Sequence, residues 1–261
     1  MVDLSTRAHG DAAARARRRS SLVSRAATAY WRRGHQHFLD RLPAYQQMPY
    51  LDLDLRSLPR TVRDQLKDAL FRRRHRDNDV PWLTPDSIDM LETVLRPTDL
   101  GLEYGAGAST PWFAARCGEL RSVEATREWY EVTQARLDAG GFTNTRLELI
   151  DADILGADTE EHIEAYVNAH PDLVPGTLDW VLIDGEYRDR TAQRAISLLR
   201  PGGLLIFDDV NLYLPVPVRG GPWRVEEPAT PLWKDLYEEI SQWRLIWTTD
   251  GVKDTAIYLK P

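Results

Sequence analysis

Short apolar runs that end in an acidic residue alternate along this chain with segments of helical periodicity. The clearest are Val181-Leu-Ile183, which precedes Asp184, and Leu204-Leu-Ile-Phe207, which precedes Asp208. Strands that alternate with helices form a mostly parallel sheet with helices on both faces. In such sheets a ligand lies beyond the carboxyl ends of the strands. The sequence therefore predicts a doubly wound, Rossmann-like α/β domain whose acids gather at one edge.

The pattern also sets the expected order of elements. We expect parallel strands at residues 101–104, 120–124, 146–150, 178–183 and 204–207, with helices at 86–95, 112–115, 129–137, 159–169 and 188–199. The first of these helices should turn Ile88, Leu91, Val94 and Leu95 inward. Two further strands, 243–247 and 255–259, flank Thr249-Asp-Gly251, and Asp-Gly is a strong hairpin signal. An antiparallel C-terminal hairpin should complete a seven-stranded sheet.

A turn with two glycines follows the first expected strand, in Glu103-Tyr-Gly-Ala-Gly107. Gly105 and Gly107 let the backbone turn sharply and approach a ligand, and Ser109 or Thr110 suits a helix cap. A nicotinamide or flavin fingerprint needs a third glycine, but Thr110 stands in its place. Glu103 would repel a pyrophosphate, whereas it suits a ligand that carries an ammonium and a sulfonium group.

The string E-x-G-x-G resembles motif I of the class I S-adenosylmethionine (SAM) methyltransferases. Together with the parallel sheet and the hairpin, the resemblance covers roughly residues 82–261. It implies SAM as cofactor. Glu124 would accept hydrogen bonds from the ribose hydroxyls. Asp151, or else Asp153, would bind the adenine amino group, and the N–H of Ala152 would assist it. The cofactor-binding set implied is Glu103, Gly105, Gly107, Ser109, Glu124, Asp151 and Ala152.

A second cluster, Asp184-Gly-Glu-Tyr-Arg188, is followed downstream by Asp208-Asp209. It resembles the metal-dependent O-methyltransferases, both the catechol type and those that act on sugars of macrolides and other glycosides. The resemblance implies Mg²⁺ held by Asp184, Asp208 and Asp209, and an acceptor hydroxyl activated by that ion. The catalytic set implied is Asp184, Glu186 and Arg188. The catechol type has a lysine shortly after the first Asp, whereas the nearby cation here is Arg188, and arginine cannot act as a base. Without the metal, Asp184 or Glu186 would be the base.

Charge is distributed unevenly along the 261 residues. Residues 1–80 hold 17 Lys and Arg against 9 Asp and Glu, whereas the remaining residues hold 16 against 31. The acidic C-terminal part argues against a nucleic-acid substrate, and the basic N-terminal part suits a solvated helical face or an arm for an acidic surface. The single Cys117 fits a reducing cytoplasm, and no apolar run is long enough to span a membrane. The Arg-rich start leaves an organellar transit peptide open as an alternative.

Two domains are expected. Residues 1–80 should form a helical extension, disordered at its start, with helices at 22–42 and 60–76 that cover the crevice or form a homodimer contact. Residues 81–261 should form the methyltransferase domain. Its Pro- and Gly-rich stretch 210–231 carries Tyr213 and Trp223, and is either an acceptor platform or a surface loop that packs its own aromatics.

These features predict a SAM-dependent O-methyltransferase, assisted by Mg²⁺, that acts on a hydroxyl of a small molecule or glycoside. One alternative is a metal-independent methyltransferase acting on nitrogen or carbon. Another is a SAM-binding protein without catalysis that uses its basic N-terminal part to contact a partner or a nucleic acid.

Overall fold

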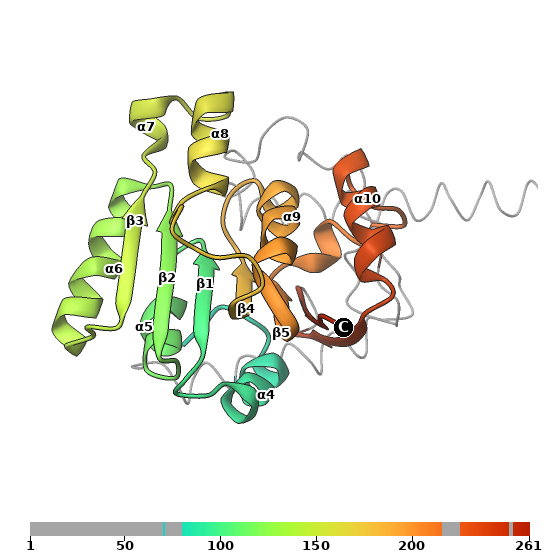
Figure 1. Cartoon of the computed structure of the whole chain (residues 1–261), viewed down its shortest axis with the longest axis horizontal. Coiled ribbons are helices and arrows are strands. Elements are labelled where there is room, and N and C mark those ends of the chain that lie inside the picture. The colour runs from blue at the N-terminus through green and yellow to red at the C-terminus, as the bar shows by residue number, and fades with distance from the viewer. Residues whose placement is uncertain (1–69, 71–79, 216–224, 251–252) are drawn as a thin grey trace, which may run out of the picture.

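The computed structural model describes Leu70 and residues 80–215, 225–250 and 253–261 (Figure 1). The expected helices at 22–42 and 60–76, apart from Leu70, and the side chain of Trp223 lie outside these residues. The described elements are α4 (Pro85–Val94), β1 (Leu100–Tyr104), α5 (Ser109–Ala114), β2 (Glu119–Glu124), α6 (Arg127–Gly140), β3 (Thr145–Leu149), α7 (Ala152–Leu155), α8 (Glu160–Val167), β4 (Leu178–Ile183), α9 (Arg188–Leu198), β5 (Leu199–Phe207), η2 (Val210–Leu212), α10 (Pro231–Ile240), β6 (Arg244–Thr249) and β7 (Asp254–Leu259).

The predicted seven-stranded sheet is confirmed, in the order β3-β2-β1-β4-β5-β7-β6. Strands β1 to β5 are parallel, and β7 runs antiparallel to both β5 and β6. This arrangement is the doubly wound, Rossmann-like α/β fold that the sequence predicts. The direction of winding reverses between β1 and β4, and ligands bind at such a reversal in open α/β sheets. The fold therefore predicts a ligand site at the loops after β1 and β4.

Helices cover both faces of the sheet (Figure 1). One core cluster joins α4, α5 and α6 to the sheet through residues such as Leu91, Phe113 and Leu137, and Phe113 stacks on Trp180 with ring centroids 4.5 Å apart. The other cluster joins α8, α9 and α10 to the opposite face. Because β4 lies between these two layers, its apolar side chains are buried on both sides, as its continuous apolar sequence predicts.

Helix α4 begins as expected, with Thr84 at the N-cap and Pro85 in the first turn. Its last turn differs from the prediction, because Val94 is exposed while Leu91 and Leu95 are buried. Strand β5 is longer than predicted and begins at Leu199, since the Pro-Gly-Gly turn is drawn into the sheet alongside Lys260.

The stretch after β5 contains a helix that the sequence reasoning missed. Thr230 caps α10 by accepting a hydrogen bond from the N–H of Trp233, and Pro231 occupies its first turn. The expected platform residue Tyr213 is buried and stacks on Trp233 with ring centroids 5.1 Å apart. The structure therefore favours, for Tyr213, the alternative in which this stretch packs its own aromatics.

Candidate active site at the carboxyl edge of the sheet

Main-chain hydrogen bonds continue past the ends of the parallel strands and tie each loop to the next. The N–H of Ala152 donates to Ala125, and the N–H groups of Gly105 and Ala106 both donate to Val123. The N–H of Asp184 donates to Tyr104, and that of Asp208 donates to Ile183. The loops after β1 to β5 therefore form one continuous floor, and the predicted acids lie along it. We call this region the crevice floor.

The glycine turn presses directly against the loop after β4. Gly105 has φ +95°, and a Cβ there would lie 2.6 Å from the backbone nitrogen of Gly185. A Cβ on Gly185 would lie 2.1 Å from the hydroxyl of Tyr166. Gly107 differs, because a Cβ built on it would meet no atom within 4 Å. Two glycines thus bring the loops together, while the third opens onto space that a ligand can approach.

Glu103 is buried under the turn with three hydroxyl groups around its carboxylate. Ser109 donates to its Oε1 at 2.5 Å, and Thr110 and Ser122 donate to its Oε2 at 2.7 and 2.6 Å. Burial raises the pKa of Glu103, and the three hydroxyls act in the opposite direction. Ser109 and Thr110 therefore hold Glu103 instead of capping α5, whose N-cap is Ala108. The carboxylate fixes the turn from below and has no exposed surface.

Glu124 ends β2 and is also buried, being 7% exposed. Its Oε1 accepts a hydrogen bond from the N–H of Thr126 at 2.8 Å. Burial raises the pKa of Glu124 to about 7. Hydrogen bonds from Thr126 and Ala125 lower this pKa, and the charge of Glu186 raises it slightly further. A buried carboxyl with so high a pKa is under-compensated, and a ligand that donates hydrogen bonds would stabilise its ionised form.

The loop after β3 uses its polar groups internally. Asp151 accepts from the N–H of Asp153 at 2.9 Å and pairs with Arg127 at 2.6 Å. The N–H of Ala152, which we expected to face an adenine, is taken by the oxygen of Ala125. The prediction for Ala152 is corrected, because the structure does not offer its N–H to a ligand. The assignment of Asp151 to the adenine stays a prediction, and its carboxylate is paired with Arg127.

Arg188 joins the loops after β4 and β5. Its guanidinium donates to the main-chain oxygens of Gly185, Asp184 and Asp208 at 3.0, 2.7 and 2.6 Å, and to the carboxylate of Asp184 at 3.0 Å. Arg188 is buried, whereas the side chain of Asp184 is 25% exposed. Burial is the largest cause that raises the pKa of Asp184 well above its ordinary value, and the charge of Asp208 is the second. The charge of Arg188 lowers this pKa. Arg188 therefore shapes the site and is buried beneath it.

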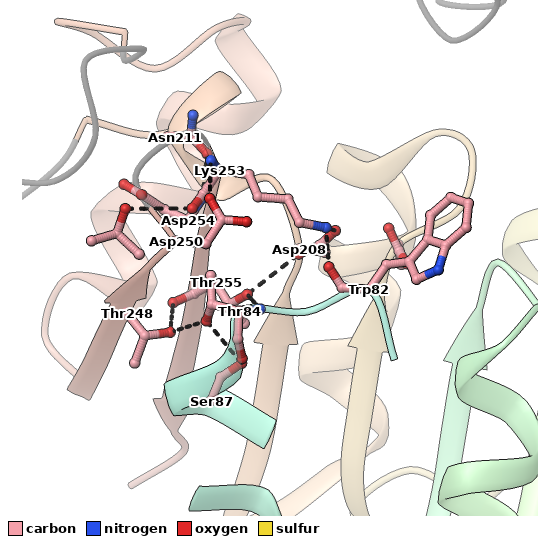
Figure 2. Close-up of polar contacts among 12 residues, drawn as sticks. Trp82, Thr84, Ser87, Asp208, Asn211, Thr248, Asp250, Lys253, Asp254 and Thr255 are labelled. Atoms are coloured by element: carbon pink, nitrogen blue, oxygen red, sulfur yellow. Dashed lines mark hydrogen bonds and ion pairs between the residues drawn. The ribbon is translucent and has the colours of Figure 1, made fainter. Parts of the chain in front are cut away.

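Lys253, which follows the predicted hairpin turn and directly precedes β7, reaches the same acids. Its ammonium donates to the main-chain oxygen of Trp82 and lies 3.3 Å from Oδ2 of Asp208 (Figure 2). Oδ1 of Asp208 accepts from the hydroxyl of Thr255 at 3.3 Å. Burial alone would lower the pKa of Lys253, but the charges of Asp208, Asp209 and Asp184 raise it overall. The sequence reasoning missed this residue.

The predicted magnesium ligands do not fit a divalent ion as they stand. Asp184 is paired with Arg188, and Asp208 with Lys253 and Thr255. Asp209 has φ 51°, in the left-handed region. Within residues 80–215, 225–250 and 253–261 no three His, Cys, Asp or Glu side chains are arranged to hold a metal ion. A hard cation needs carboxylate oxygens that face it together, and here two of the three acids face cations of the protein.

Two exposed tryptophans lie near this floor. Trp82 is 59% exposed and Trp129 is 37% exposed, and their rings meet edge to face with centroids 6.2 Å apart. Trp129 lies in the first turn of α6, just after Glu124, and the main-chain oxygen of Trp82 meets Lys253. The segment 80–84 therefore runs along the carboxyl edge from β7 towards α6 (Figure 2). Exposed aromatic rings at such an edge suit a planar or sugar ligand.

No family model and no curated protein matches the chain. A methyltransferase-like protein from Silicibacter pomeroyi is similar over 70% of this chain and 90% of its own, with 19% identity and a TM-score of 0.47. A putative caffeoyl-CoA O-methyltransferase from Staphylococcus aureus covers 80% of this chain and 100% of its own, with 17% identity and a TM-score of 0.46. A putative rRNA methylase from Clostridium thermocellum covers 70% and 98%, with 11% identity and a TM-score of 0.47.

None of the described helices is long and apolar enough to cross a membrane.

Proposed function

We propose that this chain is a SAM-dependent methyltransferase that methylates a hydroxyl group of a small molecule or glycoside. One observation carries the proposal: the glycine turn is tied by main-chain hydrogen bonds to the loops that bear Glu124 and Asp184. A nucleoside that binds at Glu124 and a proton acceptor at Asp184 would then lie on either side of the turn. When bound, SAM supplies an electrophilic methyl group on a sulfonium.

The residues of the crevice floor divide into those that face the cofactor and those that hold them in place. We assign the ribose hydroxyls to Glu124, because its buried carboxylate gains from two donors. Gly107 lets the cofactor approach the backbone. Glu103 and Ser109 position the turn from below, so their part in cofactor binding is indirect. Asp151, paired with Arg127, contributes the acceptor at the adenine end.

Asp184 is our candidate for the base. Its side chain is partly exposed, and its raised pKa makes it a stronger proton acceptor than an ordinary carboxylate. It would take the proton of the acceptor hydroxyl as the oxygen gains the methyl group. Glu186, two residues on, is the second candidate. Magnesium has no part in this proposal, because Asp184 and Asp208 are already paired with Arg188 and Lys253.

The domain organisation completes the proposal. We propose residues 81–261 as the catalytic domain and residues 1–80 as an extension that precedes it. The exposed rings of Trp82 and Trp129 lie where an acceptor would arrive, and they favour an acceptor with a planar or sugar face. We propose a small molecule over a nucleic acid because residues 81–261 are strongly acidic.

Titration calorimetry of the full chain with S-adenosylhomocysteine tests the first part, and NAD serves as the negative control. Transfer of a labelled methyl group from SAM to a panel of hydroxylated and amino acceptors, with EDTA present, tests the second. Asp184→Asn should abolish turnover and leave S-adenosylhomocysteine affinity within a few-fold, whereas Glu124→Ala should weaken that affinity. Failure of the wild-type chain to bind S-adenosylhomocysteine would contradict the proposal. Methyl transfer only to amines would show that the methylated atom is nitrogen and not oxygen.

A further inference from the structure

The acids after β4 and β5 lie beside a cation that belongs to the protein itself. We infer that the ammonium group of Lys253 takes the position that the sequence pattern assigns to a magnesium ion, and that this site works without a divalent metal. The inference concerns the residues beside the cofactor site and does not depend on which atom is methylated.

The first support is the set of contacts that hold the ammonium in place. Lys253 Nζ lies 3.3 Å from Oδ2 of Asp208 and donates to the main-chain oxygen of Trp82. Its side chain is only 21% exposed, so the ion pair is partly shielded from water. An ammonium is a compact cation with three donors, and it needs oxygen partners when it leaves water. The two named oxygens supply that need as they would for a metal ion.

The second support is the local architecture that delivers the side chain. The hairpin turn is held by Asp250, whose carboxylate accepts from the N–H of Lys253 at 2.9 Å and whose N–H donates to the oxygen of Lys253 at 3.1 Å. The next residue, Asp254, donates its N–H to the side chain of Asn211 at 2.9 Å. These bonds fix the backbone on both sides of Lys253, and the side chain extends from there to Asp208 (Figure 2).

The third support is the balance of charge. Three carboxyl groups, those of Asp184, Asp208 and Asp209, follow β4 and β5. Arg188 is paired with Asp184, and Lys253 is paired with Asp208. Arg188 is committed to three main-chain oxygens below the floor. Removing the ammonium of Lys253 would leave three carboxyl groups against one guanidinium, and an excess of carboxylate oxygens attracts a hard divalent ion.

The test uses full-length wild type, Lys253→Ala, Lys253→Arg and a control, Lys234→Ala, which removes an exposed lysine of α10. Mn²⁺ is titrated by calorimetry and by electron paramagnetic resonance. We expect wild type, Lys253→Arg and the control to bind Mn²⁺ with the same affinity, which is the baseline for Lys253→Ala. Lys253→Ala should bind one Mn²⁺ with an affinity about tenfold or more above wild type. Its melting temperature should fall, and Mn²⁺ should restore it.

Two results would overturn the inference. One is stoichiometric Mn²⁺ binding by wild type, because the ammonium would then not fill the cation position. The other is a Lys253→Ala protein that is folded by circular dichroism and gains no Mn²⁺ binding. S-adenosylhomocysteine binding is measured on the same four samples. Its absence, with the metal results as expected, would count against the proposed methyltransferase and leave the role of Lys253 intact.

Discussion

Arg188 donates to the main-chain oxygen of Asp208 at 2.6 Å and so joins the loop after β5 to the loop after β4. The same guanidinium holds Gly185 and Asp184. Its position is buried, and a planar fork with several fixed donors is the group that can meet all these oxygens at once. The guanidinium thus adds a side-chain tie between the two acidic loops to the main-chain bond from Asp208 to Ile183, and the first prediction concerns this side chain.

Arg188→Lys should destabilise the protein although the charge is kept. A lysine ammonium cannot reach the oxygens of Gly185, Asp184 and Asp208 together, so buried acceptors lose their donors at a cost of about 3 kcal/mol. Chemical denaturation measures the free energy of unfolding. The control is Arg190→Lys, where the side chain is 40% exposed and pairs with Glu160, and the change should be about 0.5 kcal/mol or less. Equal effects at both positions would contradict the structural role of Arg188.

Glu124→Gln should weaken cofactor binding and at the same time stabilise the fold above neutral pH. The folded-state pKa of about 7 lies above the ordinary value of 4.5 because the group is buried. The wild type therefore loses stability as pH rises between these values, up to about 3 kcal/mol, and Gln at this position removes that loss. The difference in melting temperature should be absent at pH 4 and largest at pH 8.

The matched control for that experiment is Glu131→Gln, which neutralises an exposed acid on α6. It should change neither the pH profile nor S-adenosylhomocysteine affinity. A Glu124→Gln protein with unchanged affinity at pH 8 would show that Glu124 does not touch the cofactor.

Gly105→Ala should affect folding, whereas Gly107→Ala should affect ligand affinity, although the two glycines are only two residues apart. At Gly105 the methyl group meets the backbone of Gly185 at 2.6 Å in a left-handed conformation, and we expect loss of folded protein. At Gly107 it meets nothing within 4 Å, so the melting temperature should hold. Nucleoside affinity should still fall about tenfold, because the methyl group stands where the ligand approaches. Calorimetry and thermal melting read both effects.

Ser122→Ala should cost about 1 kcal/mol of unfolding free energy, because it removes one of the three donors to the buried carboxylate of Glu103. Glu103→Gln should cost more, since its amide keeps only one acceptor oxygen for three hydroxyls. The exposed Ser197→Ala is the control and should change stability by about 0.5 kcal/mol or less. If Ser122→Ala were neutral, Glu103 would have enough partners without it.

The sequence predicts the sheet well and the partners of its acids poorly. Strand β4 is found within its expected limits because an apolar run flanked by turn residues leaves little choice. Helix α10 was missed because it follows a stretch rich in proline and glycine, although Thr230 and Pro231 are a readable helix start.

The site residues illustrate the same division. The acids at the strand ends could be read from the sequence, since they directly follow apolar runs. Their partners could not, because Lys253 is 45 residues from Asp208 and meets it only through the pairing of β5 with β7. Glu103 was assigned to the cofactor from its place in the string E-x-G-x-G, which does not reveal that the hydroxyls of Ser109, Thr110 and Ser122 are the hydrogen-bond partners of its carboxylate.

The row of main-chain hydrogen bonds along the crevice floor has a thermodynamic consequence. Loops that are already tied to one another, from Ala152 through Gly105 to Asp208, lose little freedom when a molecule settles on them. Most of the ordering is completed when the chain folds. A ligand would then bind to a rigid crevice floor. Adaptation to different ligands would be confined to exposed side chains such as Trp82.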